Sequence, residues 1–292
     1  MPSRRPRRRL GLWPITVVLA TTLVVLIAML VVREQDGPVG TTETADAEAV
    51  TLTTATTPRR ASSRTAKPSS GLKPTVANGL LCRPAPGHPT LVRKRAGGTS
   101  KRIALTFDDG PSRYTVPVLD ILRKADVPAT FFVIGSQVGP HREIVRRIIR
   151  DGHALANHTW SHANVSKGDA AANTQLMDTQ YAIQLAVGRA GCLMRPPAGA
   201  VGPGLDRWLR QHKKLGVLWD VDSNDYQRPT AASMTRQIVS ATRAGSIILL
   251  HDGGGDRANT VAAVPGIVKR LKAKGYEFVT VPELLKLPRA KT

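Results

Sequence analysis

The chain contains the stretch Ile103-Ala104-Leu105-Thr106-Phe107-Asp108-Asp109-Gly110-Pro111, an apolar run that ends in two carboxylates and a turn. The apolar part is typical of a short buried strand. Two adjacent carboxylates beside a core are costly unless a cation or a proton compensates them. Gly110 and Pro111 favour a turn, so we expect the acidic pair at the rim of a sheet. An acidic turn that caps the next helix is the alternative for this stretch taken alone.

Strand-like apolar runs alternate with amphipathic segments from residue 102 onward. We expect strands over 103–107, 129–134, 154–157, 217–222, 246–250 and 277–281, and helices over 114–125, 141–150, 169–188 and 261–274. This alternation favours an α/β fold in which crossover helices join parallel strands. In a complete or partial (β/α) barrel the carboxyl ends of all strands lie on one face, where active sites collect.

Two histidines follow the third expected strand. His158 and His162 are four residues apart, a spacing that would place both on one face of a helical turn and let them bind one metal ion. A carboxylate from the Asp108–Asp109 pair would complete a three-ligand site with open positions for water and substrate. This ligand set suits a catalytic Zn²⁺, or Co²⁺. One aspartate would bind the metal, and the other would act as a general base on a metal-activated water.

Further polar residues lie at strand ends and in one loop. Arg195 precedes a Gly/Pro-rich loop and could orient a carboxylate, although taken alone it could be an ordinary surface arginine. Asp222 and Asp225 close the strand expected over 217–222. His251 ends an apolar run, where a neighbouring carboxylate would raise the pKa of the imidazole and keep it protonated as a general acid.

In this order, these clusters resemble the five motifs of the polysaccharide deacetylase family, the NodB-homology or carbohydrate esterase 4 domain, over about residues 101–287. The resemblance implies a distorted (β/α) barrel of about seven repeats. The implied catalytic and metal-binding residues are the base Asp108, the metal ligands Asp109, His158 and His162, the base-orienting Arg195, the acid-tuning Asp225 and the general acid His251. The implied substrate-binding positions are Ala198, Asp222, Tyr226 and Leu249, the last as a wall of the acetyl pocket.

Two positions depart from the family pattern. Ala198 replaces the aromatic residue of the third motif, and Tyr226 replaces the tryptophan of the fourth. In the family the first of these positions contributes a backbone N–H to the oxyanion hole, which alanine still has. The departures therefore bear on substrate choice more than on chemistry.

The amino-terminal part of the chain has the pattern of an exported protein. Residues 1–9 form a basic tail with five arginines, and residues 10–32 contain no charged side chain. At ~1.5 Å per residue this run spans a hydrocarbon core of about 30 Å. It predicts a single-pass anchor in the cell membrane, with a cytoplasmic N-terminus and an extracytoplasmic domain. A cleaved signal peptide, which would leave the protein secreted, is the alternative.

The remaining boundaries follow from composition. Residues 33–75 are rich in Thr, Ala, Ser and Pro and predict a disordered linker, followed by a lead-in segment over 76–100, the folded domain over 101–287 and a tail over 288–292. Cys82 and Cys192 are the only cysteines and predict a disulfide in an oxidising compartment, with two unpaired thiols as the alternative.

The net charge of +21 suggests an anionic partner, although it could also be merely solubilising. Export argues against nucleic acid and favours an anionic cell-envelope glycan. Together with the resemblance, this predicts release of acetate from N-acetylglucosamine or N-acetylmuramic acid of peptidoglycan. An O-acetyl polysaccharide esterase with the same metal site and a non-catalytic envelope-binding module are the alternatives. The oligomeric state stays open.

Overall fold

The computed structural model describes residues 90–92 and 100–287. The predicted tail, anchor and linker, most of the lead-in segment and Cys82 lie outside the described residues. Within the described part of the chain, no helix combines the length and the apolar composition needed to cross a bilayer.

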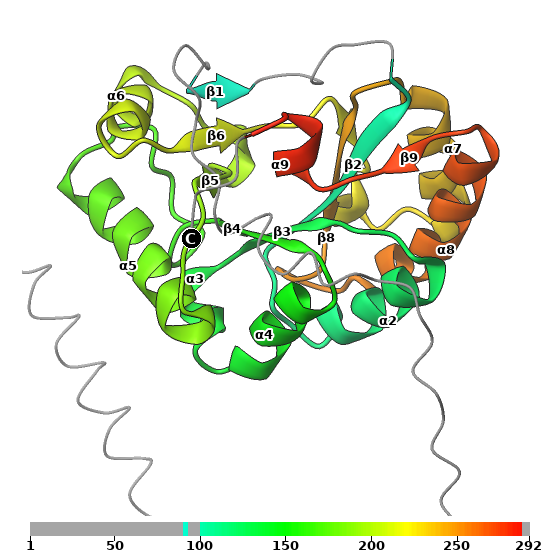
Figure 1. The fold of residues 1–292 in the computed structure, drawn as a ribbon, viewed down its shortest axis with the longest axis horizontal. Coiled ribbons are helices and arrows are strands. Elements are labelled where there is room, and N and C mark those ends of the chain that lie inside the picture. Colours follow the sequence, from blue (N-terminus) through cyan, green and yellow to red (C-terminus); the bar gives the residue numbers. More distant parts are fainter. Residues whose placement is uncertain (1–89, 93–99, 288–292) are drawn as a thin grey trace, which may run out of the picture. The chain divides into compact units, whose positions relative to one another are not determined.

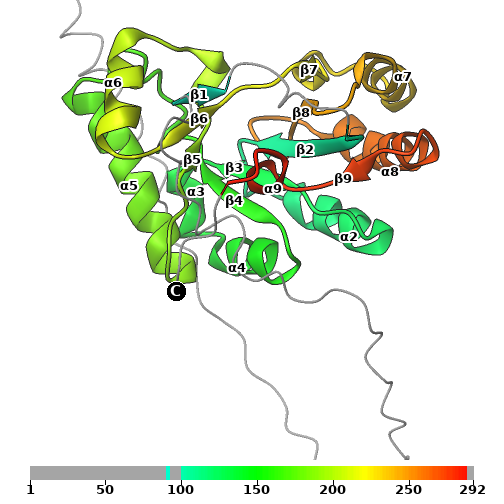
Figure 2. The same cartoon turned by 45° about the horizontal axis from the view of Figure 1, so that its top comes forward.

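The domain is built on a parallel sheet that curls into an open half-barrel (Figures 1 and 2). The strand order is β1-β6-β5-β4-β3-β2-β8-β7, and β9 pairs with β2. The described strands are β1 Leu91–Val92, β2 Arg102–Asp108, β3 Thr130–Val133, β4 Ala154–Asn157, β5 Leu193–Met194, β6 Leu215–Val217, β7 Val221–Asp222, β8 Ile247–His251 and β9 Glu277–Phe278. Because β1 and β7 form the edges, the barrel does not close.

Helices cover the outer side of the sheet, except α9, whose Val281 and Leu284 pack with inner-face residues such as Ala104 and Phe132 (Figure 2). They are α2 Thr115–Ala125, α3 Gly135–Val138, α4 Arg142–Arg150, α5 Ala170–Val187, α6 Pro203–Gln211, α7 Ala231–Ala241, α8 Ala258–Ala273 and α9 Val281–Leu284, with 3₁₀ turns η1 Pro197–Gly199 and η2 Asp225–Gln227. The apolar core lies between these helices and the sheet, and includes Phe107 stacked on Phe131 with ring centroids 5.1 Å apart. The predicted α/β class and parallel strands are confirmed.

The strand expected over 217–222 is wrong. The chain instead forms β6 and β7, which pair in different parts of the sheet, and residues 218–220 connect them across the opening of the half-barrel. At the end of β6 the carbonyls of Val217 and Leu218 accept hydrogen bonds from the buried Arg195 guanidinium, at 3.0 and 3.3 Å, and the chain leaves the sheet after Val217. Asp220 then accepts from the backbone N–H of Ile247, at the start of β8.

The carboxyl ends of the strands carry most of the predicted site residues, as expected for a parallel barrel. Asp108 ends β2 and lies in register with His251, which ends β8. His158 follows the last residue of β4, and Arg195 follows the last residue of β5. Segments far apart in sequence therefore meet at one rim.

Candidate active site and metal centre

Asp109, His158 and His162 converge at this rim. The Oδ1 atom of Asp109 lies 3.4 Å from the Nε2 atoms of both His158 and His162. One potential ligand atom of each residue lies within 4.8 Å of the others. Asp109 Oδ1 is buried and has no hydrogen-bond partner among the described residues. A buried anionic oxygen left unpartnered between two imidazoles fits a site for a divalent cation.

The ionisation of this cluster also suits a metal. Burial alone would raise the pKa of Asp109, but its electrostatic interactions with the nearby imidazoles, chiefly that of His158, outweigh burial and lower the pKa to about 2. Burial lowers the pKa of His162, with the Asp109 charge opposing it. An ionised carboxylate and a neutral imidazole are the protonation states that a metal requires of its ligands.

The two histidines are held by a loop, so the helical turn expected for them is wrong. Thr159 and His162 have left-handed backbones, with φ of 67° and 60°. The Asn157 side chain accepts from the Thr159 N–H at 2.8 Å and donates to the Leu176 carbonyl at 2.8 Å. These hydrogen bonds stabilise a turn that folds His162 back beside His158, with ring centroids 5.1 Å apart.

The orientation of the His158 ring is fixed by a hydrogen bond on the side away from Asp109. Its Nδ1 lies 2.8 Å from the carbonyl oxygen of Arg195. Because a carbonyl can only accept, Nδ1 carries the proton and Nε2 keeps its lone pair toward Asp109. The backbone of the third motif therefore positions a residue of the second.

Asp108 and Arg195 form a buried ion pair, with Asp108 2% and Arg195 0% exposed. Arg195 Nη1 donates to Asp108 Oδ1 at 2.7 Å and to Thr106 Oγ1 at 2.8 Å. The guanidinium lies over the ring of Phe132, 4.1 Å from its centroid. Asp108 Oδ2 faces the metal cluster, 3.8 Å from His158 Nε2. Arg195 thus fixes one oxygen of Asp108 and leaves the other toward the cluster.

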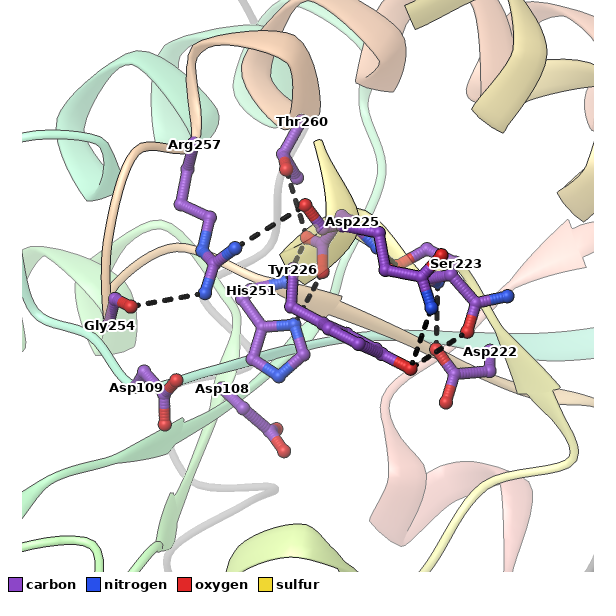
Figure 3. Close-up of polar contacts among 12 residues, drawn as sticks. Asp108, Asp109, Asp222, Ser223, Asp225, Tyr226, His251, Gly254, Arg257 and Thr260 are labelled. Atoms are coloured by element: carbon purple, nitrogen blue, oxygen red, sulfur yellow. Dashed lines mark hydrogen bonds and ion pairs between the residues drawn. The ribbon is translucent and has the colours of Figure 1, made fainter. Parts of the chain in front are cut away.

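His251 and Asp225 form an acid pair next to Asp108, since His251 is the register partner of Asp108 on the adjacent strand. His251 Nδ1 lies 2.6 Å from Asp225 Oδ1, and Asp225 Oδ2 accepts from the backbone N–H of His251 at 2.8 Å. Figure 3 shows the imidazole between the Asp225 side chain and Asp108.

This pair is poised to donate a proton. Burial would lower the pKa of His251, but the hydrogen bond to Asp225 and the charges of nearby carboxylates outweigh it and raise the pKa. Burial would raise the pKa of Asp225, but its bonds to His251 outweigh that and lower it. Both shifts favour the imidazolium form of His251 beside an ionised Asp225, which is the form that a general acid requires.

The predicted substrate positions lie around the rim. Ala198 is exposed and left-handed, with φ of 52°, and Tyr226 is 54% exposed. Leu249 is buried on the same face of β8 as His251. Asp222 accepts from the N–H of Asn224 at 2.8 Å and from the indole N–H of Trp219 at 3.0 Å. Asp222 therefore shapes the turn before Asp225, and substrate contact by these residues stays a prediction.

The predicted disulfide joins one described residue to one that lies outside the described residues. Cys192 is buried, directly before β5. Its predicted partner, Cys82, lies outside the described residues, so the disulfide between them stays a prediction.

Several site residues were not predicted as such. Asp252 is fully buried behind the acidic turn, accepts from Thr115 Oγ1 at 2.5 Å, and its N–H donates to the Asp108 carbonyl at 3.0 Å. Burial raises the pKa of the Asp252 carboxyl to about 7. Thr260 donates to Asp225 Oδ2 at 2.9 Å (Figure 3). The adjacency of Asp252 to His251 is the signal that could have drawn attention to it, whereas nothing in the sequence marks Thr260.

A parallel half-barrel with a buried base, an imidazolium–carboxylate pair and a three-ligand cluster at its carboxyl rim defines a class of acid–base hydrolases. The polysaccharide deacetylase family profile matches residues 95–217. A peptidoglycan-N-acetylglucosamine deacetylase of Bacillus cereus is 38% identical over 190 residues, which cover 64% of this chain and 89% of that relative. The chain therefore belongs to the polysaccharide deacetylase family and is a hydrolytic deacetylase.

Two further similar proteins match this chain over different shares of their own length. The peptidoglycan-N-acetylglucosamine deacetylase PgdA of Listeria monocytogenes is 38% identical over 189 residues, and the match spans 39% of its length. The crystal structure of the Bc1960 peptidoglycan N-acetylglucosamine deacetylase is similar with a TM-score of 0.66 and 32% identity, covering 69% of this chain and 95% of that one.

Proposed function

We propose that this protein removes N-acetyl groups from an envelope polysaccharide, most simply the N-acetylglucosamine of peptidoglycan, and releases acetate. The observation that carries the proposal is that one rim brings together Asp108, the Asp225–His251 pair and the Asp109–His158–His162 cluster. The names of the two deacetylase relatives support the choice of substrate. N-acetylmuramic acid is a second sugar that the same reaction would accommodate.

Asp109, His158 and His162 would hold a divalent metal, most simply Zn²⁺. When bound, such an ion polarises a carbonyl and lowers the pKa of water. The ligand set, with one anionic oxygen and two imidazoles, also fits Co²⁺.

The residues of the chain divide the proton transfers between them. Asp108, held by Arg195 through one oxygen, takes a proton from the attacking water through the other. Addition of the water oxygen to the acetyl carbon gives an oxyanion that the Ala198 N–H would stabilise. His251 then donates its proton to the departing amine as the C–N bond breaks, and Asp225 stabilises the imidazolium until that step. The products are acetate and a free amino sugar.

We also infer that the protein works at the outer side of the cell membrane. The basic residues 1–9 and the uncharged residues 10–32 support an anchor with a cytoplasmic N-terminus. The linker over 33–75 would give the domain reach toward the wall.

The proposal is tested by quantifying acetate and free amines after incubation of the protein with peptidoglycan and with O-acetylated xylan. We expect equal amounts of acetate and new amines from peptidoglycan. Asp108→Asn should lower the rate by about 10²–10⁴-fold. Asp178→Asn, at an exposed carboxylate on α5, is the matched control and should keep the wild-type rate. Acetate from xylan alone would instead establish an O-acetyl esterase, and no acetate from either substrate would leave only a binding module.

A further inference from the structure

Arg257 and Thr260 lie at the amino-terminal end of α8, and neither belongs to the motifs on which the proposed function depends. Arg257 is 5% exposed and Thr260 is 1% exposed. A guanidinium is seldom buried without a demand for its donors, because removing a charge from water is costly. Both side chains reach Asp225, the partner of His251 (Figure 3).

The donors of Arg257 connect two separate segments. Its Nε donates to the carbonyl of Gly253 at 2.7 Å, and its Nη2 donates to the carbonyl of Gly254 at 3.3 Å. Its Nη1 donates to the backbone carbonyl of Asp225 at 3.4 Å. The guanidinium therefore ties the turn that follows β8 to the 3₁₀ turn that carries Asp225.

Thr260, one turn further along α8, contacts the carboxylate of Asp225 rather than its backbone. Its hydroxyl donates to Asp225 Oδ2 at 2.9 Å, the oxygen that also accepts from the His251 backbone N–H at 2.8 Å. The other oxygen, Oδ1, is thereby left to the imidazole, 2.6 Å away. Two contacts to the backbone and side chain of Asp225 thus determine how its carboxylate meets His251.

The glycine turn held by Arg257 also lies against the metal cluster. A Cβ atom at Gly253 would clash with the Asp109 carbonyl oxygen, and one at Gly254 would clash with the Asp109 carboxylate. Gly254 also has a left-handed backbone, with φ of +68°. The turn contacts a metal-ligand candidate on one side and is fixed by Arg257 on the other.

We propose that Arg257 and Thr260 are positioning residues that hold Asp225 and His251 in the geometry needed for general-acid catalysis. The inference deepens the proposed function and rests on it, because it takes His251 as the proton donor to the leaving amine. Gly254 has the complementary role of admitting the Asp109 carboxylate to the metal cluster.

The nature of the leaving group separates positioning of the acid from general support of the fold. An amine must be protonated as it leaves, whereas the phenolate of 4-nitrophenyl acetate leaves without a proton. The Zn²⁺-loaded full-length protein is therefore assayed on an N-acetylglucosamine oligomer and on 4-nitrophenyl acetate. The variants are Arg257→Ala, Arg257→Lys and Thr260→Val, with His251→Ala as the reference for complete loss of the acid.

We expect Arg257→Ala to lower kcat for the oligomer by about 10²-fold, the lower end of the effect of removing a positioned acid. The loss of kcat that Arg257→Ala shows on 4-nitrophenyl acetate should be much smaller, and the same should hold for His251→Ala. Arg257→Lys should recover part of the lost rate, and Thr260→Val, which keeps the size of the side chain, should show the same substrate difference more weakly. Arg243→Ala is the matched control, because Arg243 also donates to two backbone carbonyls but is exposed and precedes β8.

Equal losses on both substrates in Arg257→Ala and Thr260→Val, or no loss in either, would overturn the positioning role. If Arg257→Ala fails to fold, Thr260→Val decides between these outcomes. A wild-type protein that releases no acetate from the oligomer would instead contradict the proposed function. For Gly254→Ala, calorimetric titration with Zn²⁺ should show weaker binding than in the wild type, and unchanged binding would overturn the role given to that glycine.

Discussion

At the scale of single residues, Asp108 and Asp109 differ in every contact that matters for chemistry. Asp108 is the last residue of β2 and pairs with Arg195. Asp109 has a left-handed backbone, with φ of 72°, so the chain turns between the two side chains. The turn directs the Asp109 carboxylate toward His158 and His162. Two neighbouring carboxylates thereby receive separate roles.

The pH dependence of catalysis follows from the pair of His251 and Asp225. Their hydrogen bond contributes to the raised pKa of His251, so the acid stays protonated above the ordinary range of an imidazole. Asp225→Asn removes the negative charge and lowers the pKa of His251. Activity that needs protonated His251 is lost as pH rises through that pKa, so the alkaline limb of the kcat profile should move to lower pH in the variant. An alkaline limb at the wild-type position would contradict this assignment.

The residues at strand ends could be predicted because each motif is short and polar within an apolar context. The contacts of Arg257, Thr260 and Asp252 could not be predicted, because they join distant parts of the chain. Arg257 and Thr260 lie more than 30 residues from Asp225 in sequence. Asp252 lies 137 residues from Thr115. Their role depends on which carbonyls and carboxylates the fold brings near them.

At the scale of elements, the loop after β4 determines whether two histidines can share one ion. Their four-residue spacing is compatible with a helix, but left-handed residues at 159 and 162 bring the rings together instead. The spacing alone could not distinguish these conformations. The preceding Asn157 could have indicated a turn instead of a helix, because an asparagine side chain often forms a hydrogen bond with the backbone two residues further on.

Asn157→Ala tests this loop. The change removes the hydrogen bonds to the Thr159 N–H and the Leu176 carbonyl and should cost about 1–3 kcal/mol of unfolding free energy. Zn²⁺ affinity, measured by calorimetry, should fall because the loop no longer holds His158 and His162 together. Asn164→Ala is the matched control, since Asn164 makes an equivalent contact to the Ser166 N–H at an exposed position of the same loop. Equal Zn²⁺ affinities in the two variants would contradict the role of Asn157.

The break between β6 and β7 shows a second limit of sequence patterns. Residues 217–222 form an apolar run that is typical of one strand, yet Arg195 binds the carbonyls of Val217 and Leu218 where β6 ends. The acceptors of a buried arginine are set by tertiary packing, which propensity does not encode. The same arginine orients Asp108, so its contacts link the end of β6 to the organisation of the site.

At the scale of the whole molecule, His153, which lies away from the candidate active site, makes the stability of the fold depend on pH. It is 5% exposed, its Nδ1 accepts from the Ala129 N–H at 3.1 Å, and burial lowers its pKa to about 4. The unfolded chain takes up this proton near pH 6.5, whereas the folded protein does so only near pH 4. The stability due to neutral His153 is therefore complete above pH 6.5 and declines as pH falls toward 4.

Urea unfolding at several pH values tests this coupling. Between pH 6.5 and pH 5, His153 should contribute a loss of about 1.5 kcal/mol to the wild-type unfolding free energy. His153→Asn keeps an acceptor for the Ala129 N–H but does not titrate, so the variant should lose less stability over this range. A wild-type and a variant with the same pH dependence would exclude His153 as the cause.

The overall α/β architecture could be predicted from the sequence, but its shortest strands could not. Alternating apolar and amphipathic segments are sufficient to indicate parallel strands with outer helices. Short elements such as β1 and β5, of two residues each, exist only through their pairing with β6 and β4, and carry no periodic signal of their own. The anchor and linker predicted over 10–75 lie outside the described residues and stay predictions.

The central claim is that Asp109, His158 and His162 bind a divalent metal that Asp108 needs for hydrolysis. The most direct measurement is acetate release from peptidoglycan by chelator-treated protein before and after addition of Zn²⁺ or Co²⁺, together with Zn²⁺ titration of Asp108→Asn and Asp109→Asn. Chelation should abolish activity, and added metal should restore it. Asp108→Asn should bind Zn²⁺ without activity, and Asp109→Asn should bind it poorly. Full activity after complete removal of the metal would contradict the account.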